Sequence, residues 1–150
     1  MEQKRSRITL YSVQLVKERN ITVYGEKTIK CPQDAEKVIR ELIGLSDREV
    51  FVAIFLNTKN KITGAEKVSV GSLNSAIVSP REVFKAAILH NAASIIVGHN
   101  HPSGDDTPSR EDLQVTKRLV EAGKLLDIEV LDHLIIGEET FKSLKESGMI

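Results

Sequence analysis

An almost unbroken apolar run begins after Glu49 and continues as Val-Phe-Val-Ala-Ile-Phe-Leu to position 56. Its residues are mostly β-branched or aromatic and the run is short for a helix, so it predicts a strand. Because apolar side chains point to both sides of such a strand, other elements must cover both of its faces. A second run of this kind, over residues 93–97, predicts a second buried strand. We therefore expect a sheet with helices on its faces.

Capping signals place helices around these strands. Residues 31–34 open a helical pattern with apolar residues at three- and four-residue spacing, and Gly44 stands at its expected C-terminal cap. Ser79 precedes a Pro and stands three residues before Glu82, which predicts a second helix start. A third helix is expected to open at residues 108–112. The apolar side of this third helix is expected to comprise Leu113, Leu119, Val120 and Leu126.

Further strands are predicted over residues 8–16, 62–70 and 128–136. A short helix is expected from about residue 139 to the end of the chain. Strands and helices do not alternate regularly, so the predicted fold class is α+β (mixed α/β), with a single sheet flanked by helices. Residues 1–30 are expected to form an N-terminal strand or arm, and residues 31–150 the folded domain.

Composition limits the classes of function. Lys and Arg number 21 and so do Asp and Glu, so the net charge gives no electrostatic basis for binding nucleic acid or an anionic membrane. Residues 1–40 carry nine Lys or Arg against five Asp or Glu, which favours a solvated arm or edge strand over a weak phosphate-binding arm. The single Cys excludes an intramolecular disulfide and a Cys-rich zinc site. No apolar run approaches the roughly 18 residues of a membrane span and no secretory signal is visible, so we expect a soluble, cytoplasmic protein.

The residues that carry chemistry follow the strand over 93–97. His99 and His101 are separated by one residue, and in an extended chain such positions project to the same side. Asp112 lies about one turn inside the following helix, and the intervening loop is long enough to bring its carboxylate back to the imidazoles. Two imidazoles and one carboxylate are good zinc ligands, and three protein ligands leave a fourth position open, as in catalytic sites.

These residues also have a plain structural explanation. A His-x-His pair alone is often an incidental surface or packing pair. Ser109 and Asp112 form a Ser-x-x-Asp sequence at a helix start, which resembles a capping box whose carboxylate suits the helix dipole. The two roles are compatible, because a capping carboxylate is able to face a metal ion as well. Asn100 and Ser103 are expected only to shape the loop.

The pattern His99-x-His101, seven residues, Ser109, two residues, Asp112 resembles the JAMM (MPN+, JAB) zinc metalloprotease motif. The longer string HNHPSGDDTPSREDLQVTKRL, with SPREVFKAAILHNAASIIVG before it and LDHLIIG after it, resembles the JAB domain of bacterial RadC-like proteins. The resemblance covers roughly residues 30–148. It implies a JAB/MPN-like, cytidine-deaminase-like architecture for the folded domain.

This resemblance implies one zinc ion per chain, with His99, His101 and Asp112 as its ligands. The implied function is that of a zinc-dependent hydrolase of the JAMM metallopeptidase type, in which a metal-activated water attacks a peptide or isopeptide carbonyl. A peptide or protein is then the expected substrate. RadC-like proteins also carry a DNA-repair label, so a non-catalytic or DNA-linked module remains an alternative. A metal-dependent nuclease and an inactive scaffold are further alternatives.

The resemblance also implies roles outside the ligand set. Ser109 would hydrogen-bond the oxygen of the tetrahedral intermediate, and Glu49 matches the family's general base at the start of a strand. Glu82 and Glu111 compete for the role of base, but helix capping already explains Glu82, and Glu111 adjoins a ligand. His133 belongs to an Asp-His pair of the RadC-like pattern, where it would line the site. A His between apolar neighbours is more often a buried core residue, so His133 is left out of the ligand set.

Overall fold

The computed structural model describes residues 1–71 and 78–150, which form one five-stranded sheet and three helices. The strands lie in the order β2-β1-β3-β4-β5. Their bounds are Glu49–Leu56 for β1, Ile62–Gly71 for β2, Ser94–Asn100 for β3, Glu129–Ile136 for β4 and Phe141–Ser143 for β5. Strands β3 and β4 run parallel, and the other neighbouring strands run antiparallel. The predicted fold class is confirmed.

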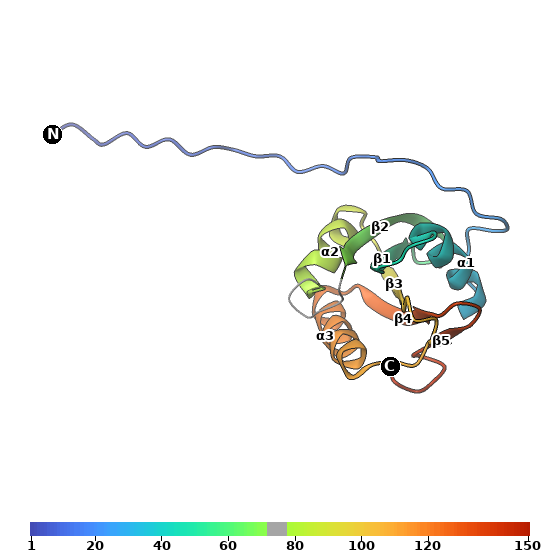
Figure 1. Ribbon diagram of the computed structural model, residues 1–150. Coiled ribbons are helices and arrows are strands. Elements are labelled where there is room, and N and C mark those ends of the chain that lie inside the picture. The colour runs from blue at the N-terminus through green and yellow to red at the C-terminus, as the bar shows by residue number, and fades with distance from the viewer. Residues whose placement is uncertain (72–77) are drawn as a thin grey trace.

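Helices cover both faces of this sheet (Figure 1). Helix α1 (Pro32–Ile43) packs on one face, and helices α2 (Pro80–Leu89) and α3 (Arg110–Leu126) pack on the other. Strand β1 is buried on both sides because alternate residues enter the two cores, as its apolar run predicts. Its residues in the core beneath α2 and α3 are Phe51, Ala53 and Phe55. Its residues in the core beneath α1 are Val50, Val52, Ile54 and Leu56.

The predicted capping signals set the helix bounds. Gly44 ends α1 with a φ of 65°, a conformation that suits glycine. The Oγ of Ser79 accepts a hydrogen bond from the N–H of Glu82 at the start of α2, and Ser109 caps α3. All three predicted helix starts are confirmed. None of the helices described is both long and apolar enough to cross a membrane.

Two predicted element bounds differ in the structure. The strand predicted over residues 93–97 continues to Asn100, because its ladder with β4 extends to a pair with Ile136. His99 therefore lies inside a strand and not in the loop after it. The helix predicted from about residue 139 is wrong, because residues 141–143 pair with the free edge of β4 as strand β5.

The apolar side predicted for α3 is also partly wrong. Leu119 is buried as expected, but Leu113 and Leu126 are exposed. The helix instead turns two polar residues, Asp112 and Thr116, toward the sheet, where both are buried. Their polar atoms find partners there, which hydropathy alone does not reveal.

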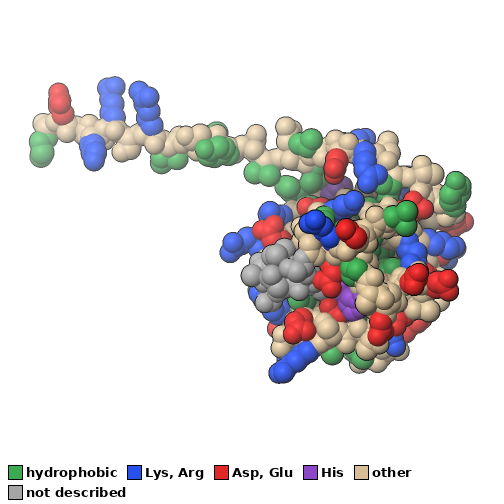
Figure 2. Space-filling view, viewed as in Figure 1, with side chains coloured by type: hydrophobic (Ala, Val, Ile, Leu, Met, Phe, Trp, Pro, Cys, Tyr) green, Lys and Arg blue, Asp and Glu red, His purple; other side chains and the backbone are tan. Residues whose placement is uncertain are grey.

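The strand predicted over residues 8–16 does not form. This segment extends away from the body as an arm with exposed apolar side chains, and Figure 2 shows blue Lys and Arg side chains near its outer end. Ile21 and Val23 are the first residues that pack against the core beneath α1. The two edge strands of the sheet are β5, which has three residues, and β2, whose register with β1 shifts twice, and residues 8–16 pair with neither.

Candidate metal centre

The two histidines meet at the C-terminal end of β3. His99 is the second-last residue of the strand and is fully buried, and His101 follows the strand directly. Their Nε2 atoms lie 3.1 Å apart. The imidazoles converge because two residues of extended backbone separate them, as the sequence predicts.

Asp112 joins this pair from the first turn of α3. Its Oδ1 lies 3.1 Å from His99 Nε2, and its Oδ2 lies 3.0 Å from His101 Nε2. The N–H of Ser109 donates to Oδ2 at 2.8 Å while the N–H of Asp112 donates to Ser109 Oγ at 3.1 Å, so the predicted capping box is formed.

The donor set suits zinc. Within residues 1–71 and 78–150, each of the three side chains places one ligand atom within 4.8 Å of the others. Two ligands that are each about 2.0–2.1 Å from a tetrahedral ion lie about 3.3 Å from each other. The separations of 3.0–3.1 Å in the structure are close to that value. Two imidazole nitrogens and one carboxylate oxygen also match the ligands of catalytic zinc sites. The three side chains therefore fit a zinc ion.

Each imidazole has a partner at its other nitrogen. His101 Nδ1 donates to the backbone carbonyl of Asp105 at 2.8 Å, which leaves its Nε2 with a lone pair. His99 Nδ1 lies 2.8 Å from Nε2 of His133. His133 is fully buried, and burial lowers the pKa of its imidazole well below the usual range. The sequence pointed to His133 only through its Asp-His pair, and it gave no signal for its contact with a ligand.

Glu49 starts β1 at the same end of the sheet. The register pairs Phe51 with His99, so the strand alternation places Glu49 on the face of the sheet that carries His99. It lies two residues beyond Phe51 in the direction of His101, and it is half-buried. Glu49 therefore starts β1 at the same end and on the same face of the sheet as His99.

The side chain of Asn100 links this part of β1 to β3, the strand that contains His99. Its Oδ1 accepts from the N–H of Val50 at 2.7 Å, and its Nδ2 donates to the carbonyl of Arg48 at 2.9 Å. Both bonds are to the backbone of residues that flank Glu49. The side chain is buried, so it does more than shape the loop as the sequence suggested.

The remaining candidates occupy separate positions. Ser109 is exposed at the start of α3, and its Oγ keeps a proton for donation while it accepts from Asp112. Glu82 lies in the first turn of α2 and pairs with Lys85 at 3.1 Å. Glu111 is exposed on α3 beside Asp112. Neither glutamate belongs to the group of three ligands.

The loop that contains His101 is hydrogen-bonded to the turn between β4 and β5. The N–H of Glu138 donates to the carbonyl of Gly104 at 3.1 Å, and a Cβ on Gly137 would lie 2.5 Å from that same oxygen. Arg40 on α1 donates hydrogen bonds of 3.1–3.3 Å to three carbonyl oxygens of this turn. The loop is therefore held by backbone contacts that reach back to α1.

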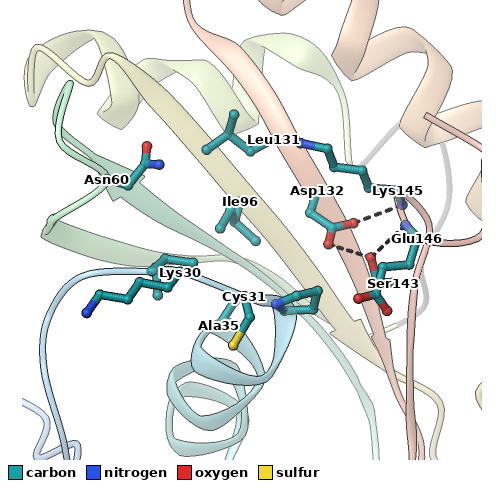
Figure 3. Close-up of a pocket in the computed structure, with 12 residues that line it drawn as sticks. Lys30, Cys31, Ala35, Asn60, Ile96, Leu131, Asp132, Ser143, Lys145 and Glu146 are labelled. Atoms are coloured by element: carbon teal, nitrogen blue, oxygen red, sulfur yellow. Dashed lines mark hydrogen bonds between the residues drawn. The ribbon is translucent and has the colours of Figure 1, made fainter.

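A separate pocket of about 330 Å³ opens on the α1 side of the sheet (Figure 3). Ile96 and Asp132 line it from the sheet, together with the start of α1. The carboxylate of Asp132 accepts hydrogen bonds from the hydroxyl of Ser143 and the backbone N–H of Lys145, so its oxygens are already occupied. Ile96 belongs to the core beneath α1, whereas His99 stacks on Phe51 of the other core, so this pocket is not part of the metal group.

Known proteins resemble the chain over its folded part. The family described as RadC-like JAB domain matches residues 29–149. The chain is 57% identical over 122 residues to a UPF0758 protein of Geobacillus thermodenitrificans, which is 81% of this chain and 54% of that protein. It is 55% identical over 123 residues to a UPF0758 protein of Bacillus cereus, which is 82% of this chain and 55% of that protein. The chain spans about half the length of the curated relatives it matches.

Proposed function

Because the chain belongs to the RadC-like JAB domain family, we propose that it is a zinc-dependent hydrolase of the JAMM metallopeptidase type, which cleaves a peptide or isopeptide bond. The observation that carries this proposal is the convergence of His99, His101 and Asp112. The single mixed sheet with three helices agrees with a JAB/MPN-like fold. A peptide or protein is the substrate class, since this chemistry acts on an amide carbonyl.

A zinc ion bound at this site would supply a Lewis acid that polarises the substrate carbonyl and lowers the pKa of a water toward about 7. His99 and His101 would hold the ion through Nε2, and Asp112 would hold it through its carboxylate. Glu49 takes the proton of the attacking water and delivers it to the leaving nitrogen, a contribution of typically 10²–10⁴ in rate. Ser109 donates its hydroxyl hydrogen bond to the oxyanion that develops on the carbonyl oxygen.

Metal content is the first test. Untagged protein should contain about one zinc per chain by plasma mass spectrometry, and His101→Ala should lose it because two ligands bind zinc weakly. His101 lies after β3 and not in the core, so this variant should keep its fold by circular dichroism. A parent protein that takes up no zinc near neutral pH refutes the proposal.

The role of the base is tested on peptide and isopeptide substrates. Glu49→Gln should retain zinc and lose about 10²–10⁴ in rate, because glutamine cannot accept the proton. Glu82→Gln and Glu111→Gln are matched controls with the same chemical change, and both should keep their zinc and most of their activity. If one of these controls loses activity while Glu49→Gln keeps it, the base is assigned to the wrong residue.

A further inference from the structure

His99 is held at both ring nitrogens. Its Nε2 lies 3.1 Å from Asp112 Oδ1 and 3.1 Å from His101 Nε2, and its Nδ1 lies 2.8 Å from His133 Nε2. The Nδ1 of His133 lies 2.5 Å from the Oγ1 of Thr116, which donates to the backbone carbonyl of Asp112 at 2.7 Å. These contacts form a closed path of short polar contacts that begins at the carboxylate of Asp112 and ends at its backbone carbonyl.

The direction of each bond follows from the number of protons. Thr116 has one hydroxyl proton and gives it to a carbonyl, so its Oγ1 must accept from His133 Nδ1–H. His133 is 0% exposed and lies against Phe51, an environment that disfavours a charged imidazole. A neutral imidazole has one N–H, so Nε2 of His133 is an acceptor and His99 Nδ1 is its donor. The Nε2 of His99 therefore carries a lone pair. The Nε2 of His101 does so as well, because its Nδ1 donates to a carbonyl.

Two lone pairs and a carboxylate then converge with no proton between them, an arrangement that a cation stabilises. We propose that His133 and Thr116 are positioning residues that keep Nε2 of His99 unprotonated and aimed at the metal. This inference rests on the proposed function, since it assigns both residues to the same zinc site. Metal-binding histidines commonly donate to a carboxylate, a backbone carbonyl or water. Here a second, neutral imidazole takes that place.

Water cannot reach the site to take the place of His133 as the hydrogen-bond acceptor of His99. His99 and His133 are both 0% exposed. Phe51 stacks on His99 with ring centroids 5.9 Å apart and meets the edge of His133 at 5.5 Å. Without His133, the Nδ1–H of His99 loses its acceptor in an apolar environment. The alternative tautomer, with the proton on Nε2, then competes directly with metal binding.

Zinc affinity tests this role without reference to activity. His133→Leu should raise the Kd for zinc roughly 10- to 100-fold in competition with a chromophoric chelator. His133→Gln should recover most of the affinity, because its carbonyl oxygen is able to accept from His99 while its amide donates to Thr116. Thr116→Val should cause a smaller rise. His90→Leu is the matched control, since His90 packs on Phe55 away from the ligands, and its Kd should equal that of the parent.

The tautomers are measured directly in the zinc-free parent by multiple-bond proton–nitrogen correlation spectra. His99, His101 and His133 should each carry the proton on Nδ1. A His99 that is protonated on Nε2 overturns the proposal, and so does a folded His133→Leu variant that binds zinc as tightly as the parent. If the parent binds no zinc, the proposed hydrolase function is refuted. The tautomers then still decide whether His99 donates to His133 and His133 donates to Thr116.

Discussion

Asn100 binds the backbone on both sides of Glu49, through the N–H of Val50 and the carbonyl of Arg48. Asn100 stands between His99 and His101, so one side chain links the strand of the proposed base to the strand of the proposed metal site. These two hydrogen bonds extend the contact between β1 and β3 beyond their last paired residues, Phe51 and His99.

Asn100→Asp should separate these two strands locally. The aspartate keeps an acceptor for Val50 but places an oxygen against the carbonyl of Arg48, so the start of β1 should shift. We expect zinc to be retained and kcat to fall by about tenfold or more, because small displacements of a reacting group are costly. Asn57→Asp is the control at the other end of β1, where the Oδ1 of Asn57 accepts two backbone N–H bonds. An unchanged kcat in Asn100→Asp would contradict the proposed link.

Ile39 fills the space that a side chain at position 98 would need. A Cβ on Gly98 would lie 2.7 Å from Ile39 Cδ1 and 3.0 Å from its Cγ2. Gly98→Ala should therefore push α1 away from β3 and lower the free energy of unfolding by roughly 1–3 kcal/mol. Ile39→Val removes the nearer methyl group and alone costs about 0.5–1.5 kcal/mol. Urea denaturation should show that the double variant loses less than the sum of the single losses. Additive losses would show that the two residues do not compete for space.

Ser109 caps helix α3 and is also proposed to contact the substrate. A Ser109→Gly substitution distinguishes these two roles. Glycine at a cap costs only a few tenths of a kcal/mol, so Ser109→Gly should be nearly as stable as the parent. It should nevertheless lose roughly 10²-fold in kcat, since the hydroxyl donor to the oxyanion is gone. Ser79→Gly makes the same change at the cap of α2 and should keep full activity. Equal activities in the two variants would leave Ser109 with its capping role alone.

Glu66 on β2 makes the free energy of unfolding depend on pH. Its Oε2 is buried and has no hydrogen-bond partner in the described part of the chain. Burial raises the pKa of Glu66 above 4.5, and the nearby Lys85 only partly opposes this. The folded state thus binds the proton more tightly than the unfolded state, so stability is lost as pH rises through the folded-state pKa.

Glu66→Gln stays neutral and should be more stable than the parent at about pH 7. The advantage should disappear as pH falls below about 4.5, where the glutamate becomes protonated in the unfolded state too. Thermal unfolding of both proteins across this range measures the difference. Glu41→Gln, at an exposed position of α1, should show no such trend. A constant difference between Glu66→Gln and the parent at all pH values would contradict this account.

Local chemistry explains what was predictable from the sequence. The caps at Ser79 and Ser109 locate the starts of two helices to within a few residues. The apolar run after Glu49 forms a strand because its side chains point alternately to both faces of the sheet and both faces are covered. The convergence of His99 and His101 also follows from two residues of extended backbone. Each of these features depends on neighbours in the sequence.

The errors concern contacts between distant parts of the chain. Residues 141–143 form a strand because β4 has a free edge, which no local pattern reveals. His133 looked like a core residue because its neighbours are apolar, and its burial is as expected, but its partners come from β3 and α3. The arm over residues 8–16 has the composition of a strand, yet it pairs with no strand of the described sheet.

The guanidinium of Arg40 sits 97 to 100 positions before the carbonyls that it binds. Those carbonyls belong to the turn that holds Gly104, which follows His101 by three residues. A protein engineer who transplanted only residues 99–112 into another scaffold would bring the three ligands and leave behind their anchorage. Such a graft would need a guanidinium on a neighbouring helix, and a turn like that between β4 and β5, before it could hold an ion with the same geometry.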